Sequence, residues 1–193
     1  MSTTIQEVIG ILDRSGSMYG KEQDTVGGIN VLLSELKSNY DANSNDIIRV
    51  SLKLFDHEEQ LLWRSRLLSD IDCLNINEFV PRGQTALLDA LGNTLKYFMQ
   101  KRSLNPEAYT KCLIYLTTDG YENCSRIYTR QDIKKMIETA KQEYNIDVIY
   151  LAANQDAILE AGNIGIDANQ AINYSENREN TEAVYRAVGR VAS

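Results

Sequence analysis

The segment IGILDRSGSM, residues 9–18, predicts the centre of the fold. Its apolar half is typical of a buried strand, and that strand ends in the carboxylate of Asp13. The hydroxyls of Ser15 and Ser17 follow at alternate positions, and glycines then change the chain direction before a helical pattern begins. We therefore expect these polar side chains on a loop at the carboxyl end of a central strand, where open α/β sheets bind their ligands.

Apolar runs and helical periodicities alternate along the rest of the chain. Such alternation favours a mostly parallel sheet that is covered by helices on both faces. Two of the predicted strands are joined by a short polar turn, which indicates an antiparallel hairpin at one edge. We predict one α/β domain over residues 1–193, a three-layer, doubly wound, Rossmann-like fold with a mostly parallel six-stranded sheet and one antiparallel edge strand. The strands are expected at 7–12, 48–54, 61–68, 112–116, 146–151 and 171–174, and the helices at 21–39, 86–100, 129–144, 156–161 and 181–191.

The composition excludes several classes of partner. The net charge is -7, which argues against nucleic acid or an anionic membrane surface as the main partner. No apolar run has the length of a transmembrane helix, and the first residues lack the pattern of a signal peptide. Cys73, Cys112 and Cys124 have no spacing typical of a metal site, which favours free thiols in a reducing compartment. We therefore expect a cytoplasmic protein.

Three loops should meet at the carboxyl ends of the central strands. The first carries Asp13, Ser15 and Ser17, the second carries Thr85 just before a predicted helix, and the third carries Asp119 after a strongly apolar strand. All the candidate ligand atoms are oxygens, which a hard cation such as Mg2+ prefers in octahedral geometry. The sequence therefore predicts a divalent-metal site made of these five residues.

The charge of the inner shell determines what such a site would do. If Ser15, Ser17 and Thr85 bind the metal directly, while Asp13 and Asp119 act through waters or hydrogen bonds, the direct ligands are neutral. The ion then stays electrophilic, and an incoming carboxylate is a favourable sixth ligand. If both aspartates bind directly, the positive charge is compensated within the protein. The composition favours the first arrangement, which suits switchable capture of an acidic residue.

Three motifs resemble the metal-ion-dependent adhesion site (MIDAS) of the von Willebrand factor A family, whose fold is also called the integrin I domain. They are DRSGS at 13–17, GQTALLDA at 83–90 and TDG at 118–120, and they match the family's site in residue type, order and approximate spacing. The resemblance extends over nearly the whole chain, so residues 1–193 would form a single domain of this family. Shorter similarities to small stand-alone bacterial or phage members occur at 122–125, 128–129 and 152–156.

The resemblance implies how the site would work. Mg2+, with Mn2+ or Ca2+ as alternatives, would be bound through Ser15, Ser17 and Thr85, with Asp13 and Asp119 in support. An Asp or Glu of a partner protein would complete the shell of the metal. Capture of that residue would move Asp119 and shift the closing helix along the sheet. By family analogy, the partner would belong to a system linked to an AAA+ ATPase.

Four residues near the predicted metal would form the rim that meets a partner: Arg14, Tyr19, Gly120 and Tyr121. Arg14 lies beside the metal loop and would steer an acidic ligand, although the pattern of an ordinary solvated loop residue fits it as well. The two tyrosines follow metal-loop segments, where a recognition face and plain surface are both reasonable. Asp89 lies in the first turn of the helix after the second loop, and we expect it to be structural and to orient the first loop.

The oxygen-only site has no evident general base, so we expect no catalytic residue and a metal-dependent protein-binding module that captures an acidic residue of a partner. One alternative is a Mg2+-dependent phosphohydrolase that activates water. Asp13 at a strand end resembles the aspartate of phosphotransferases that form an aspartyl-phosphate. Those enzymes usually carry a second aspartate two residues further on, where this chain has Ser15. Another alternative is a self-assembling structural protein, in which the acidic turn 56–59 or Glu122 of one copy fills the metal site of another.

Overall fold

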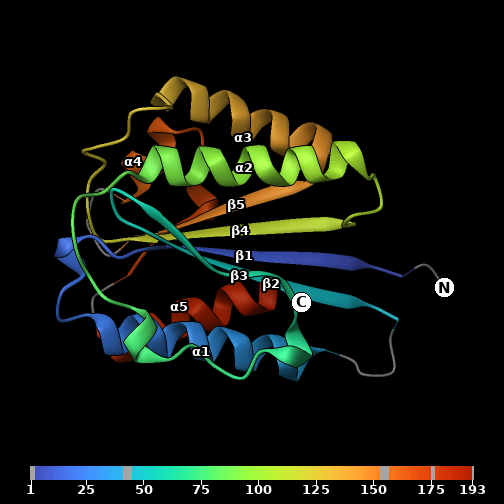
Figure 1. The fold of residues 1–193 in the computed structure, drawn as a ribbon, viewed down its shortest axis with the longest axis horizontal. Helices are drawn as coiled ribbons and strands as arrows, with labels where there is room; N and C mark the ends of the chain where they lie inside the picture. Colours follow the sequence, from blue (N-terminus) through green and yellow to red (C-terminus); the bar gives the residue numbers. More distant parts are fainter. Residues whose placement is uncertain (1–2, 41–44, 153–156, 175–176, 193) are drawn as a thin grey trace.

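A six-stranded sheet in the order β3-β2-β1-β4-β5-β6 forms the middle layer of the molecule (Figure 1). The structure is a computed structural model that describes residues 3–40, 45–152, 157–174 and 177–192. Neighbouring strands pair in parallel except β2 and β3, which form an antiparallel hairpin at one edge, so the predicted fold class is confirmed. The strands are β1 (Ile5–Asp13), β2 (Ile47–Phe55), β3 (Glu59–Leu67), β4 (Lys111–Thr118), β5 (Ile146–Ala152) and β6 (Ala171–Asn173).

Helices cover both faces of the sheet (Figure 1). α1 and α5 lie on one face, where the apolar side of each helix packs with β1 and β2 into one buried cluster. α2, α3 and α4 lie on the other face and form a second cluster with β1, β4 and β5. The helices are α1 (Glu22–Asn39), α2 (Leu87–Leu104), α3 (Arg130–Tyr144), α4 (Ala157–Asn163) and α5 (Arg178–Val191).

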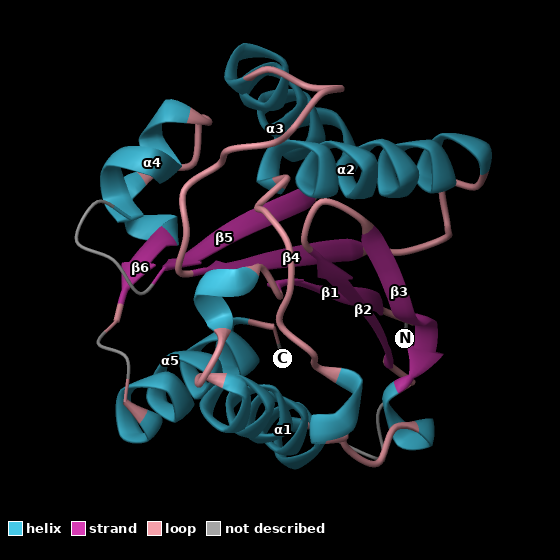
Figure 2. Ribbon diagram, turned by 60° about the vertical axis from the view of Figure 1, so that its left-hand side comes forward, coloured by secondary structure: helices cyan, strands magenta, loops and turns pink. Residues whose placement is uncertain are grey.

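β1 lies between β2 and β4 and is buried along almost its whole length. Its Gly10 is required by close packing, because a Cβ there would approach the Tyr115 hydroxyl on β4 to 2.3 Å. The register pairs Leu12 with Thr117, so the loops that follow β1 and β4 begin side by side. Figure 2 brings this end of the sheet forward and shows the loops that gather there.

The ends of several helices differ from the predicted ones for local reasons. α2 continues to Leu104 rather than ending at residue 100, and its additional turn places Lys101 against the buried Glu7. α5 begins at Arg178, because the side chain of Asn177 accepts the backbone N–H of Asn180 and caps the helix. α3 begins where its Thr129 cap predicts. The predicted start of the short helix at 156 lies outside the described residues.

Two further expectations concern the chain as a whole. Cys73, Cys112 and Cys124 are all free thiols, as their spacing predicts. Within the described ranges, none of the helices combines the length and the apolar character needed to span a bilayer.

Candidate metal centre

Asp13 is the last residue of β1 and is completely buried. Its Oδ1 accepts the backbone N–H of Ser15 at 2.7 Å, and its Oδ2 accepts the hydroxyl of Thr118 at 2.6 Å. Burial raises the pKa of this carboxyl to about 6, and the hydrogen bonds from Thr118 and Ser15 offset that effect only in part. Asp13 is thus a desolvated carboxylate whose direct contacts are neutral donors.

The first loop continues the site toward β4. A short 3-10 turn, η1 (Gly16–Met18), brings Ser15 and Ser17 together, with 3.1 Å between their Oγ atoms. Ser17 Oγ donates to Asp119 Oδ1 at 2.6 Å, and Asp119 follows directly after β4. The parallel arrangement of β1 and β4 therefore joins two loops that are 102 residues apart in sequence.

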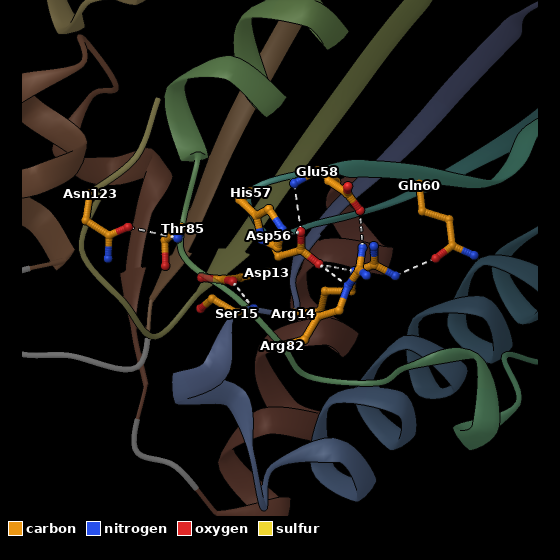
Figure 3. A network of polar contacts seen from close by, with 10 residues as sticks. All are labelled: Asp13, Arg14, Ser15, Asp56, His57, Glu58, Gln60, Arg82, Thr85 and Asn123. Carbon is orange, nitrogen blue, oxygen red and sulfur yellow. Dashed lines mark hydrogen bonds and ion pairs between the residues drawn. The ribbon is translucent and has the colours of Figure 1, made fainter. Parts of the chain in front are cut away.

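Thr85 enters the site from the loop before α2. Its backbone N–H donates to Asn123 Oδ1 at 3.0 Å, and the N–H of Asn123 donates to the Thr85 carbonyl at 3.1 Å (Figure 3). The residue is only 3% exposed, yet its Oγ1 makes no hydrogen bond with any residue in the described part of the chain. A buried hydroxyl of this kind indicates that another ligand satisfies it.

Gly120 shows how closely the oxygens from the three loops approach one another. A Cβ on this glycine would lie 3.2 Å from Ser17 Oγ, 3.3 Å from Thr85 Oγ1 and 3.8 Å from Asp13 Oδ2. Asp119, its neighbour, already contacts Ser17. The structure thus brings together all the residues predicted for the metal site, and the donor set fits a hard divalent cation because every available ligand atom is an oxygen.

The expectation that Arg14 lies on the rim is wrong. The residue is only 6% exposed, and its Nε donates to Asp56 Oδ2 at 2.8 Å while Nη1 contacts Gln60. The guanidinium therefore points away from the metal loop, because the buried carboxylate that follows β2 attracts it (Figure 3). The other predicted rim residues reach the surface: Tyr19 is 81% exposed, Tyr121 is 52% exposed and Gly120 is partly exposed.

Asp56 has a structural role that the sequence did not predict, since the turn 56–59 was expected only as a possible ligand for the metal of a second copy. It is completely buried, and its carboxylate accepts the N–H of Glu58 at 2.7 Å, Arg82 Nε at 2.9 Å and Arg14 Nε at 2.8 Å. Burial acts against ionisation, but the hydrogen bonds from Glu58 and Arg82 and the charges of both arginines outweigh it, so the pKa of Asp56 is lowered. Its carbonyl also accepts the N–H of Ala86 at 2.9 Å, next to Thr85.

The loops around Asp56 are joined by their backbones as well. The N–H of Arg82 donates to the Arg14 carbonyl at 2.7 Å, and the N–H of Gly16 donates to the Gly83 carbonyl at 3.1 Å. Asp56 therefore supports both the first metal loop and the loop that carries Thr85. A signal for it exists in the sequence, since Asp56 follows β2 directly in the way that Asp13 ends β1.

A second group of metal-type ligands lies in the same network. One ligand atom each of Asp56, His57 and Glu58 lies within 4.8 Å of the others. Arg82 already pairs with two of them, with Nε 2.9 Å from Asp56 and Nη2 2.5 Å from Glu58. Arg14 pairs with Asp56 as well. Because arginines already neutralise these carboxylates, the group is a structural ion-pair network and not our candidate for the metal.

Two further acidic residues organise the third loop. Asp89 accepts the backbone N–H groups of residues 126–128 at 2.8 to 3.0 Å, so the expectation that it orients the first loop is wrong. Glu122 accepts the N–H of Leu88 at 2.9 Å and those of residues 124–125 at 2.9 and 2.7 Å. Both carboxylates are satisfied within their own chain, which argues against Glu122 as a ligand for the metal of a second copy.

Comparison with known proteins decides the family. A model described as the von Willebrand factor type A domain matches residues 7–187. The chain belongs to the von Willebrand factor type A domain family. No curated protein sequence matches the chain.

Solved structures share this fold at low sequence identity. Proximal thread matrix protein 1 from the mussel byssus, with a zinc-occupied MIDAS motif, has a TM-score of 0.70 and 17% identity, and the match covers 98% of this chain and 48% of that protein. The von Willebrand factor domain of a type V pilus tip protein from Porphyromonas gingivalis has a TM-score of 0.64 and 12% identity, with 100% and 98% covered. The manganese-loaded TRAP protein of Plasmodium vivax has a TM-score of 0.54 and 20% identity, with 77% and 57% covered. The chain thus spans about half the length of the mussel protein.

Proposed function

We propose that this protein is a metal-dependent protein-binding module that captures an acidic residue of a partner. Ser15, Ser17 and Thr85 would bind a divalent cation, Mg2+ or Mn2+, and Asp13 and Asp119 would hold the site in place. The observation that carries the proposal is the Thr85 hydroxyl, which is buried and has no hydrogen-bond partner among the described residues. Burial of such a group without a partner costs free energy, which a bound cation at this point would offset.

The hydrogen bonds of the two aspartates support an inner shell of hydroxyls. Both oxygens of Asp13 accept protein donors, from Ser15 and Thr118. Both oxygens of Asp119 do so as well, from Ser17 and Lys21. The carboxylates can therefore act through the groups they already contact, while the hydroxyl oxygens keep lone pairs for a metal.

A bound cation would supply a Lewis-acidic centre at the protein surface. With neutral hydroxyls as direct ligands, most of its charge stays uncompensated, and a carboxylate is the ligand that compensates it best. The exposed tyrosines Tyr19 and Tyr121 and the partly exposed Gly120 would contact the partner around that carboxylate. The net charge of -7 argues against nucleic acid as the partner. We include a cytoplasmic location in the proposal because the three cysteines are free thiols.

The structural relatives support the proposal only in general terms. One has a zinc-occupied MIDAS motif, one is loaded with manganese, and one is a domain of a pilus tip protein. From the first two we transfer the use of a divalent metal. Binding to a partner protein, capture of its acidic residue and a link to an AAA+ ATPase are parts of our own proposal.

Calorimetric titration with Mg2+ and Mn2+ tests the site, and a pull-down from native lysate with Mg2+ or with EDTA tests the function. We compare wild type with Thr85→Val, which removes the hydroxyl and keeps the shape of the side chain. Thr94→Val is the matched control, because Thr94 is equally buried, lies in the interior of α2, and its hydroxyl donates to the Ala90 carbonyl alone among the described residues.

We expect Thr85→Val to weaken metal binding by roughly 10- to 100-fold or more, with loss of every partner that EDTA removes from wild type. Thr94→Val should bind metal and partners as wild type does. Equal metal affinity in the two variants would contradict the site. Partners that are the same for wild type with Mg2+, wild type with EDTA and Thr85→Val would contradict the function.

A further inference from the structure

Lys21 brings a positive charge of the protein itself to the candidate metal centre. It is the residue before α1, and its ammonium donates to Asp119 Oδ2. The Asp119 side chain is only 3% exposed and the Lys21 side chain is 28% exposed. The other oxygen of Asp119 accepts the hydroxyl of Ser17. The buried carboxylate of Asp119 therefore joins the Lys21 ammonium to Ser17, which is a proposed metal ligand.

The backbone holds Lys21 in this position. Its N–H donates to the Met18 carbonyl at 3.1 Å at the end of the metal loop, and its carbonyl accepts the N–H of Thr25 at 3.0 Å in the first turn of α1. The Lys21–Asp119 pair lines a pocket of about 300 Å³ together with Tyr19. Lys21 thus lies between the metal loop and a recess that a partner can reach.

The charges differ from those of a site with two free carboxylates. Asp13 and Asp119 contribute two negative charges and Lys21 contributes one positive charge, so these three groups sum to -1. Arg14, the nearest arginine in sequence, is paired with Asp56 and points away. Among the residues that the structure describes, Lys21 is the only cation that forms an ion pair with either metal-loop aspartate.

We propose that Lys21 sets the balance between metal affinity and ligand capture at this site. The inference rests on the proposed function and adds a regulator to it. The ammonium repels a divalent cation and so weakens its binding in the absence of a partner. The same positive charge attracts an incoming carboxylate, so the carboxylate binds the metal-loaded site more tightly. Retention of the metal therefore depends more on capture of the acidic residue than it would without Lys21.

Mn2+ titration of four proteins, with and without acetate as the carboxylate probe, tests the inference. They are wild type, Lys21→Met, Lys21→Arg and Lys96→Met. Lys21→Met removes the charge and keeps the length of the side chain, whereas Lys21→Arg keeps the charge. Lys96→Met is the matched control, since Lys96 is an exposed lysine on α2 and its loss changes the net charge equally.

We expect Lys21→Met to bind Mn2+ more tightly than wild type by a factor on the order of ten, and to gain less affinity from acetate. Lys21→Arg and Lys96→Met should behave as wild type does. Circular dichroism and unfolding of each variant establish that it is folded, and if Lys21→Met is unfolded, Lys21→Gln replaces it. Equal Mn2+ affinity and equal acetate dependence in Lys21→Met and Lys96→Met would overturn the inference.

The pattern of failure separates this inference from the proposed function. If wild type binds Mn2+ and Thr85→Val does not, the metal site stands whatever Lys21→Met does. If Lys21→Met then matches wild type, only the role of Lys21 is wrong. If wild type binds no divalent cation, both the site and its regulator are wrong.

Discussion

Two buried aspartates stand at the ends of neighbouring strands, and the protein stabilises them in opposite ways. Asp13 ends β1 opposite Phe55 of β2, and Asp56 is the next residue of that chain segment. Both are completely buried. Asp56 pairs with two guanidinium groups and has a lowered pKa, whereas Asp13 accepts only neutral donors from Ser15 and Thr118 and has a pKa raised to about 6.

This difference separates a structural carboxylate from one that is prepared for a cation. If proximity of acidic and imidazole groups were the only criterion, Asp56 would be the predicted metal ligand, since it lies in a cluster with His57 and Glu58. Its arginine partners already supply the positive charge that such a cluster requires. No cation in the described part of the chain pairs with Asp13, so Asp13 is the carboxylate whose burial a bound metal would offset.

The largest effect is expected from Asp56→Ala, which removes the carboxylate that pairs with both arginines. It leaves Arg14 buried without its ion-pair partner, and loss of one member of a buried pair costs about 3–5 kcal/mol of the free energy of unfolding. Urea unfolding measures this loss, with Glu58→Ala as a control because that carboxylate is exposed. A cost below about 1 kcal/mol would be that of a surface ion pair, and it would contradict the structural role of Asp56.

Asp13→Asn is expected to increase the free energy of unfolding of the metal-free protein, whereas Asp56→Ala decreases it. A pKa raised from 3.8 to about 6 means that the folded state disfavours the charged form, at a cost of about 3 kcal/mol above the folded pKa. Asn removes the charge, and Thr118 Oγ can then donate to the Gly120 carbonyl at 3.2 Å instead. Asp13→Asn should therefore be more stable than wild type by up to that amount at neutral pH in EDTA.

The difference in stability between Asp13→Asn and wild type should depend on pH. The favourable state of Asp13 is the neutral one, so its contribution is fully present below the unfolded pKa and is lost as the pH rises through about 6. The stability gap between Asp13→Asn and wild type should accordingly vanish at about pH 4 and open between about pH 4 and pH 7. A gap that is constant over this range would mean that burial of the charge is not its cause.

Metal removal is expected to have the next largest effect. A divalent cation present at about 100 times its Kd stabilises the folded state by about 2.7 kcal/mol, provided that it binds only the folded protein. Thermal unfolding with Mg2+ and with EDTA should show this shift for wild type, and for Asp56→Glu if its loops stay in place. Thr85→Val, with metal binding weakened by roughly 10- to 100-fold, should be stabilised by only about 0.4 to 1.4 kcal/mol at the same Mg2+ concentration. If Mg2+ stabilised Thr85→Val as much as wild type, the metal would bind somewhere other than the loops around Asp13.

The smallest effect is expected from Thr118→Val, which removes one neutral donor from Asp13. The variant keeps the shape of the side chain, so the cost is that of one hydrogen bond to a charged group, about 1.5 kcal/mol. Loss of that donor should also raise the pKa of Asp13 further, since the hydrogen bond favours the charged form. Urea unfolding across the pH range measures both. An unchanged pH dependence would show that Thr118 does not stabilise the ionised carboxylate.

Much of the fold was predictable because its signals are local. Apolar periodicity places the six strands and five helices within a few residues of their observed bounds, and the cap of Thr129 places the start of α3. The ends were less predictable. α2 runs to Leu104 rather than to residue 100, in a turn whose Lys101 reaches Glu7, and that contact joins segments 94 residues apart.

The sequence by itself determined which elements form, which family they belong to and which oxygens meet, because parallel strands end at one edge and each carries its polar loop there. Only the tertiary structure decided where the long charged side chains go. Arg14 turns to Asp56, 42 residues away, and Lys21 turns to Asp119, 98 residues away. The partner of a flexible cation depends on which buried carboxylate lies within its reach, and distant segments set that, so no local pattern can encode it.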